Sequence, residues 1–259
     1  MNHKHESSKI TLSTNDSLIA RSQLFHSLNE YPASSEETER SLGLFLRGSL
    51  LARILGTCEI YQQILNLPGS ILDIGTWRGQ TAVLCENFRA IYEPLNFNRR
   101  VICFDTFLGY QGFGEQDKPT ELHKDGTYGV GGDDYATYLS NLLQLHEKNN
   151  AMGHNHGKHS VISGDCRKTI PQFFRDHPQE FVSLAFFDLN SYQPTKDAVE
   201  AVIARLVPGG VLAFWQLSRG EAIPAEGKFY AEEVISKYSH SIRSTKSYPG
   251  LCYLIKTDK

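Results

Sequence analysis

The sequence predicts a doubly wound α/β fold with a mostly parallel sheet, and three observations lead to this prediction. The chain has 259 residues, of which 40% are hydrophobic, so it can bury one large core. From about residue 69 onwards, short β-branched or aromatic runs alternate with segments of helical periodicity. Most of these runs are followed by acidic or small residues. Alternation of this kind implies right-handed crossovers between parallel strands.

The elements are expected in the following order. Residues 1–35 are polar and form a flexible arm with a short helix at 18–28, and residues 36–68 form a helical extension of two helices. An α/β domain at 69–259 follows, with strands at 70–74, 101–104, 160–162, 182–187 and 211–214 and helices at 81–92, 135–148, 169–174, 195–206 and 230–238. Segments 242–248 and 251–256 flank Pro249-Gly250 and predict an antiparallel C-terminal hairpin, which brings the sheet to seven strands.

Composition and charge exclude several classes of protein. The 26 Lys and Arg against 29 Asp and Glu leave a net charge of −3, which favours neither nucleic acid nor a membrane surface as partner. No apolar stretch reaches the roughly 20 residues of a membrane-spanning helix, and residues 1–20 lack the apolar core of a secretory signal. We therefore expect a cytoplasmic protein. The five cysteines form no C-x-x-C pair, so buried free thiols are expected.

Residues that follow the first three strands predict a ligand site, because ligands of open α/β sheets bind at the carboxyl ends of the strands. Gly75 and Gly79 bracket a strand-to-helix turn where a ligand can approach the backbone, although a purely structural turn stays an alternative. The G-x-G-x-x-G fingerprint is absent, which argues against the interpretation of the protein as a nicotinamide-dependent reductase. Asp105 can accept hydrogen bonds from a ribose diol, whereas Asp165 suits an exocyclic amine or a helix N-cap equally well.

The segments ILDIGTWRGQTA, ICFDTF, SGDCRKTIP, FFDLNSYQPTKDA and LVPGGVLAF together resemble the class I S-adenosylmethionine (SAM) dependent methyltransferases. Within that class the match is to the macrocin O-methyltransferase (TylF-like) and deoxyhexose O-methyltransferase family, from about residue 51 to residue 256. The resemblance implies a Rossmann-like methyltransferase sheet, SAM as cofactor, and a hydroxylated small-molecule acceptor, commonly a nucleotide-linked or antibiotic-linked deoxysugar. It implies a cofactor site over the strand-end residues Asp73, Gly75, Thr76, Gly79, Asp105, Thr106, Asp165 and Cys166.

The sequence departs from this family at the positions of the general base, which removes the proton of the acceptor, and of the metal ligands. Relatives place a second acid two positions after the residue matching Asp188, as general base, and further acids after the fifth strand as metal ligands. This chain has Asn190, Trp215 and Gln216 instead, and a neutral amide is a poor ligand for a hard dication. We therefore predict no metal site. Two interpretations stay open: Asp188 or a histidine is the base, or the reaction has been lost and the protein only binds SAM or a partner.

Two further segments carry histidines. The insertion at 109–135 contains several glycines and is typical of a lid over an acceptor, and its His123 is a second candidate base, with an exposed loop histidine as the alternative. The tract GHNHGKH at 153–159 contains good metal ligands, but its place before the third strand favours a solvated loop. A homodimer through the N-terminal helices is expected by analogy alone.

Overall fold

The computed structural model describes residues 14–120, 123–150, 157–218 and 223–257. The chain divides into two compact units, one ending at Ala52 and the other starting at Arg53. The first unit contains α1 (Asn15–Asn29), α2 (Ser35–Arg40), the 3-10 helix η1 (Leu42–Phe45) and the start of α3 (Gly48–Gln62). A capping box between Ser34 and Glu37 fixes the start of α2. No side chain of α1, α2 or η1 is buried.

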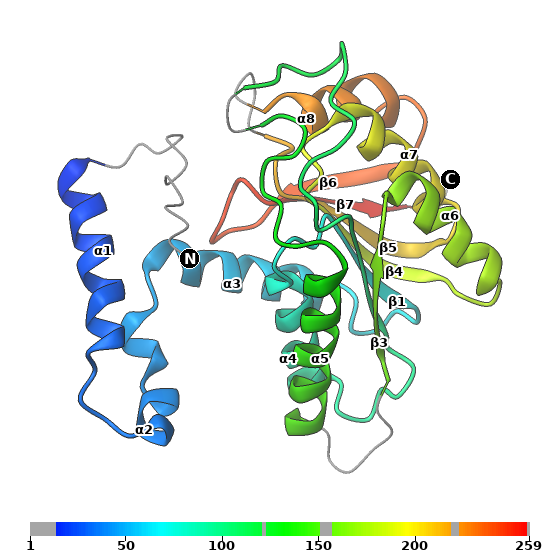
Figure 1. Cartoon of the computed structure of the whole chain (residues 1–259). Helices are drawn as coiled ribbons and strands as arrows, with labels where there is room; N and C mark the ends of the chain where they lie inside the picture. Colours follow the sequence, from blue (N-terminus) through cyan, green and yellow to red (C-terminus); the bar gives the residue numbers. More distant parts are fainter. Residues whose placement is uncertain (1–13, 121–122, 151–156, 219–222, 258–259) are drawn as a thin grey trace. The chain divides into compact units, whose positions relative to one another are not determined.

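The second unit is built on a seven-stranded sheet with the order β3-β2-β1-β4-β5-β7-β6 (Figure 1). Its strands are β1 (Ser70–Ile74), β2 (Val101–Asp105), β3 (His159–Ser163), β4 (Val182–Phe187), β5 (Leu206–Phe214), β6 (His240–Ser244) and β7 (Cys252–Lys256). The first five strands pair in parallel, whereas β7 is antiparallel to both β5 and β6. This arrangement confirms the predicted doubly wound sheet with an antiparallel C-terminal hairpin.

Helices cover both faces of this sheet (Figure 1). The helices are α4 (Gln80–Tyr92), α5 (Asp133–Asn150), α6 (Cys166–Asp176), α7 (Tyr192–Ile203), α8 (Ala225–Phe229) and the π-helix η3 (Tyr230–Val234). Alternation along each strand divides the core in two: Leu72 and Ile74 of β1 pack with α6, α7 and α8, while Ile71 packs with α3, α4 and α5. Because a parallel strand is covered on both sides, every residue of β1 and β4 is buried.

Of the helices predicted for the α/β domain, three differ most in their bounds from those observed. The helix at 169–174 begins earlier, at Cys166, because the Asp165 side chain caps it. The helix at 195–206 lies instead at Tyr192–Ile203, since Leu206 already pairs with Val182 as the first residue of β5. The helix at 230–238 is replaced by α8 and η3, and the N–H of Ile235 donates to the oxygen of Tyr230 at 3.1 Å, five residues back.

No helix within the described residues is long and apolar enough to cross a membrane. All five cysteines lie in the described part of the chain and are free, and four of them are buried. The histidine tract falls mostly at 151–156, outside the described residues, but His159 lies on β3, where its ring is 3.4 Å from the Glu147 carboxylate.

Candidate active site

The carboxyl ends of β1, β2 and β4 bring three aspartates together. Asp73 lies in β1, Asp105 ends β2, and Asp188 directly follows β4, with β1 between the other two strands. The charges of Asp105 and Asp188 both act on Asp73, which is 3% exposed. The pKa of Asp73 is raised from its ordinary value to about 7, mainly by burial and secondly by these two charges. Strand-end acids far apart in sequence therefore share one small region.

The turn between β1 and α4 needs glycine at both of its ends. Gly75 has φ +80°, and a Cβ there would lie 2.5 Å from the main-chain oxygen of Asp188. Gly79 has φ +82°, and a Cβ there would lie 2.2 Å from Leu139. Inside the turn, the Thr76 hydroxyl donates to the main-chain oxygen of Asp73 at 2.6 Å. The chain thus passes tightly between the end of β4 and α5, and neither glycine has room for a side chain.

One carboxylate oxygen beside this turn has no internal partner. The Oδ2 atom of Asp73 is buried and makes no hydrogen bond within the described residues. A buried carboxylate normally has a partner, because removing the charge from water without compensation is costly. The orphan oxygen fits a ligand that brings a cation or a hydrogen-bond donor to the end of β1.

The Asp105 side chain turns toward the same loop. Its Oδ2 accepts the N–H of Trp77 at 2.6 Å, and its Oδ1 accepts the N–H of Phe107 at 2.6 Å. Burial raises the pKa of Asp105 above its ordinary value. Each carboxylate oxygen can accept a second hydrogen bond, so the geometry leaves capacity for a ribose diol. Thr106 instead shapes the chain that follows, since its hydroxyl donates to the oxygen of Gly109 at 3.0 Å.

Asp165 and Cys166 lie at the start of α6, and both have structural contacts. Asp165 caps the helix by accepting the N–H of Arg167 at 3.0 Å, and its carboxylate pairs with the Arg167 guanidinium at 2.6 Å. The hydrogen bonds from Arg167 hold the pKa of Asp165 below its ordinary value. Cys166 is 6% exposed within the core, and burial raises the pKa of its thiol to about 12. The N-cap alternative for Asp165 is thus what the structure contains.

Asp188 is contacted by two amides, Asn190 and Gln216, at positions where the family resemblance implies acids. The side-chain nitrogens of Asn190 and Gln216 lie 3.1 Å and 3.5 Å from its Oδ1. Asn190 has φ +56°, a strained conformation for a residue with a side chain. The amide oxygens of both residues are buried without a hydrogen-bond partner in the described part of the chain. Burial raises the pKa of Asp188 above its ordinary value.

Sequence reasoning missed Glu226, a fully buried acid beside this cluster. Glu226 lies in the first turn of α8, and its Oε2 accepts the N–H of Gln216 at 2.8 Å. Burial, then the charge of Asp188, raises its pKa well above the ordinary value. The resemblance to the family predicts acids directly after β5, whereas Glu226 lies ten residues beyond Gln216. An acid in the first turn of a short helix is too common a pattern to have singled it out.

The insertion after β2 reaches this cluster through two aromatic rings. The amide nitrogen of Asn190 donates to the Tyr110 hydroxyl at 2.6 Å. The His123 ring stacks on Tyr110 with 6.1 Å between centroids, and His123 is only 7% exposed. The alternative of an exposed loop histidine is therefore wrong. In Figure 1 this insertion runs up beside α8, and Lys228 of α8 donates to Gln116 of the insertion.

Comparison with known proteins identifies the family. The family model described as a methyltransferase domain matches residues 72–214, more than half of the chain, and the protein belongs to this family. This range contains the turn after β1 and all three aspartates. The described residues contain no group of three His, Cys, Asp or Glu side chains arranged as metal ligands.

Individual relatives are methyltransferases by name, and one of them is described as acting on TDP-rhamnose. The crystal structure of CalS11, calicheamicin methyltransferase, has a TM-score of 0.88 and 29% identity, covering 96% of this chain and 95% of that one. The apo structure of CalS11, a TDP-rhamnose 3'-O-methyltransferase, has a TM-score of 0.80 and 27% identity over 96% of this chain and 97% of that one. Mycinamicin III 3''-O-methyltransferase from Micromonospora griseorubida is 23% identical over 56% of this chain and 54% of its own length. The match thus spans about half the length of that relative.

Proposed function

We propose that the protein is a SAM-dependent O-methyltransferase that acts on a hydroxyl of a sugar, either nucleotide-linked or attached to a natural product. The observation that carries this proposal is the nearly full-length similarity to the CalS11 structures, one of which is described as a TDP-rhamnose 3'-O-methyltransferase. The cluster of buried strand-end carboxylates supports it independently, because a cationic, ribose-containing donor complements that cluster.

The cofactor assignment rests on the chemistry of the residues present. The orphan oxygen of Asp73 suits the ammonium group of the methionine part, and the main chain of the turn between Gly75 and Gly79 suits its carboxylate. Asp105 suits the ribose hydroxyls, with Thr76 and Thr106 holding the two turns beside it. Asp165 and Cys166 border the adenine end in this assignment. SAM supplies a methyl group already activated on a sulfonium, so the chain has to align the acceptor and remove its proton.

Asp188 is the better candidate for the base. Its raised pKa makes the carboxylate a stronger proton acceptor near neutral pH, whereas neutral Asn190 takes no proton. His123 is the second candidate, since the insertion buries it against Tyr110, whose hydroxyl is bonded to Asn190. Replacing Asp188 by Asn removes the carboxylate with little change in shape and separates the two: loss of turnover with His123→Gln still active assigns the base to Asp188.

Cofactor binding is tested by calorimetry on purified protein freed of ligand. We expect S-adenosylhomocysteine to bind, and Asp105→Ala to weaken it by about 1–3 kcal/mol, because ribose hydroxyls lose their buried acceptor. Asp176→Ala, at an exposed aspartate on α6, is the matched control and should bind like the wild type. Absence of binding to the wild-type protein would remove the proposal altogether, and an unchanged affinity in Asp105→Ala would remove the ribose assignment.

A second candidate is a protein that binds SAM without methyl transfer, which the amides at Asn190 and Gln216 favour. The two candidates differ in turnover of TDP-rhamnose and related deoxysugars with methyl-labelled SAM. Transfer of label to any of these sugars rejects the binding-only protein. Repeating the assay with a chelator then decides whether a dissociable metal ion takes part.

A further inference from the structure

Arg53 of α3 places an unpaired buried donor beside the candidate active site. Its guanidinium carbon lies 4.3 Å from the centroid of the Trp215 ring, and 5.9 Å from that of Tyr248. Trp215 directly follows β5 at the carboxyl edge and is 4% exposed. The Nε atom of Arg53 is buried and has no hydrogen-bond partner within the described residues. Stacking on an aromatic ring fixes the plane of the guanidinium and leaves its edge for hydrogen bonding.

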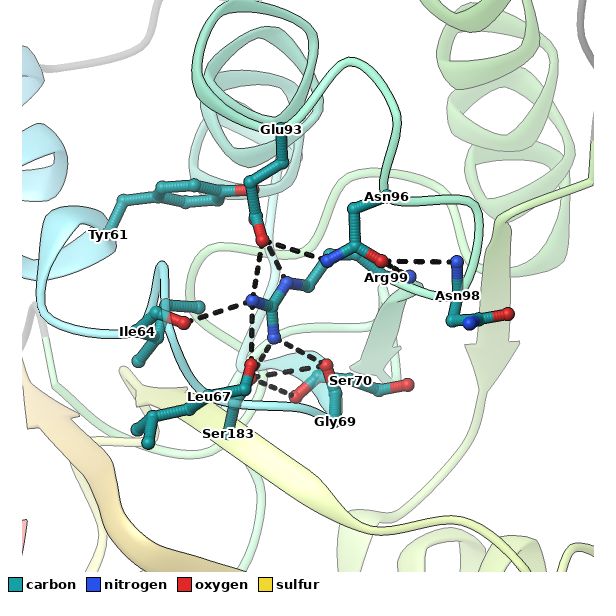
Figure 2. Close-up of polar contacts among 10 residues, drawn as sticks. All are labelled: Tyr61, Ile64, Leu67, Gly69, Ser70, Glu93, Asn96, Asn98, Arg99 and Ser183. Carbon is teal, nitrogen blue, oxygen red and sulfur yellow. Dashed lines mark hydrogen bonds and ion pairs between the residues drawn. The ribbon is translucent and has the colours of Figure 1, made fainter.

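Other arginines of this chain show how unusual that arrangement is. Arg99, on the opposite edge of the sheet, uses its Nε and both terminal nitrogens for hydrogen bonds to protein atoms (Figure 2). Arg205 also stacks on an aromatic ring, at 5.4 Å from Phe174, but donates to the main-chain oxygen of Pro178 at 2.8 Å. A buried arginine donor without a partner is costly, so the Nε of Arg53 fits a ligand oxygen.

The surroundings of Arg53 are rich in acids and in oxygen atoms. The charged or titratable groups that act on Asp188 or are acted on by it are Arg53, Asp73, Asp105, Tyr110 and Glu226. Arg53 is the cation in this set, and its charge is the main influence that opposes the burial of Asp188. Nearby, the amide oxygens of Asn190 and Gln216 are buried acceptors without partners in the described chain. One charged donor, two neutral acceptors and one carboxylate complement neighbouring hydroxyl groups, which both donate and accept.

We propose that Arg53 binds the acceptor at the oxygen that becomes methylated, while Asn190 and Gln216 accept hydrogen bonds from its neighbouring hydroxyls. This inference rests on the proposed methyl transfer to a sugar. The acceptor oxygen gives its proton to the Asp188 carboxylate and forms the new C–O bond as the S–C bond breaks, its electron pair staying on sulfur. The Nε–H of Arg53 stabilises the negative charge that develops on this oxygen during proton loss. Arg53 of α3 thereby provides a positive charge in a site where amides, Asn190 and Gln216, replace the acids that the family resemblance implies.

Arg53→Gln tests this role, with Arg205→Gln as the matched control at a stacked arginine distant from Asp188. The probe is TDP-rhamnose, or whichever deoxysugar of a panel the wild-type enzyme methylates. We expect kcat/KM for the acceptor to fall on the order of 100-fold, as for loss of a donor to developing charge. Acceptor affinity, measured by calorimetry with S-adenosylhomocysteine bound, should fall roughly tenfold. The affinity for S-adenosylhomocysteine itself and all properties of Arg205→Gln should stay unchanged.

The pH profile provides a readout that a purely structural role would not move. Arg53 lowers the pKa of Asp188, so in Arg53→Gln the acidic limb of the kcat/KM profile should shift to higher pH. Arg53→Lys, which keeps the charge but has no Nε–H over Trp215, covers the case in which the glutamine variant does not fold. It should keep the position of the limb and lose acceptor affinity.

The outcomes separate this inference from the proposed function. Wild-type acceptor affinity and an unmoved acidic limb in a folded Arg53 variant would overturn the role of Arg53 while methyl transfer stands. Failure of the wild type to methylate any sugar of the panel would overturn both. Restored turnover of Arg53→Gln on addition of free guanidinium ion would support the inference directly.

Discussion

At the scale of single residues, the candidate active site is a set of buried carboxylates with too few positive charges nearby to balance them. Burial raises the pKa of Asp73, Asp105, Asp188 and Glu226 alike. A raised pKa means that the folded chain holds the carboxyl protons more tightly than the unfolded chain does. The folded chain therefore loses stability as rising pH releases these protons. The ligand-free protein is therefore expected to be less stable at pH 8 than at pH 5.5, and a cationic cofactor is expected to offset this loss.

Asp73→Asn isolates one of these carboxylates. The pKa of Asp73 is about 7 in the folded protein against 3.8 ordinarily, so its contribution to the free energy of unfolding decreases as pH rises through this interval. We expect the variant to gain on the order of 1–2 kcal/mol relative to the wild type between pH 5.5 and pH 8. Urea unfolding of the ligand-free proteins at several pH values measures this difference. Parallel pH curves for the two proteins would show that Asp73 does not titrate in this interval.

At the scale of secondary-structure elements, the insertion between β2 and α5 supplies a missing helix cap. Ser191, the N-cap of α7, makes no side-chain cap bond. Asp117 of the insertion instead accepts the N–H of Tyr192 at 2.8 Å with one oxygen and that of Gly114 at 2.9 Å with the other. Since α7 begins just after Asn190, docking of the insertion and the geometry beside Asp188 are coupled.

Asp117→Ala should therefore loosen the insertion as well as α7. We expect a loss of about 1 kcal/mol in stability, as for other caps, with faster proteolysis within residues 107–132 and a higher acceptor KM. Limited proteolysis and steady-state kinetics measure these effects. Asp125→Ala removes a contact inside the insertion, to the N–H of Phe113, and is the control. Equal proteolysis of the Asp117 variant and the wild type would argue against docking through this cap.

At the scale of the whole molecule, a single buried arginine, Arg99, links several segments at the edge of the sheet opposite the candidate active site (Figure 2). Arg99 has a fully buried side chain and pairs with Glu93 at 2.8 Å. Its two terminal nitrogens also donate to the oxygens of Ile64, Leu67 and Gly69 and to the Ser183 hydroxyl at 2.6–3.0 Å. Burial alone would raise the pKa of Glu93, but the hydrogen bonds from Arg99 and Tyr61 hold it below its ordinary value.

Arg99→Met should destabilise the protein strongly, because it leaves Glu93 and several carbonyl groups buried without their partner. Breaking a buried pair in this way typically costs about 3–5 kcal/mol, measured here by urea unfolding. Arg175→Met, at an arginine that donates to exposed Gln172, should change stability by less than about 0.5 kcal/mol. Folded Arg99→Met should still bind S-adenosylhomocysteine. A loss in stability as small as that of the control would show that the Arg99 network contributes little.

The helices of the first unit leave their apolar side chains at least partly exposed. None of the side chains of α1, α2 or η1 is buried, and Phe25 and Leu44 are 67% and 66% exposed. A segment that buries no apolar surface obtains little stability from hydrophobic packing. The homodimer through these helices stays a prediction.

The amino-acid sequence by itself determined the fold class, because helical and strand periodicities depend on local residue patterns. It also located Asp73, Asp105 and Asp188, since an acid directly after a strand has a defined place in a parallel sheet. Only the tertiary structure brought Arg53 and Glu226 to this edge and packed the buried His123 ring against Tyr110. Their helices and loops carry no local signal of where they pack, and an unpaired Nε on Trp215 exists only once α3 and β5 have come together. Burial and long-range contacts, which decide the chemistry of these groups, arise from the folded chain as a whole.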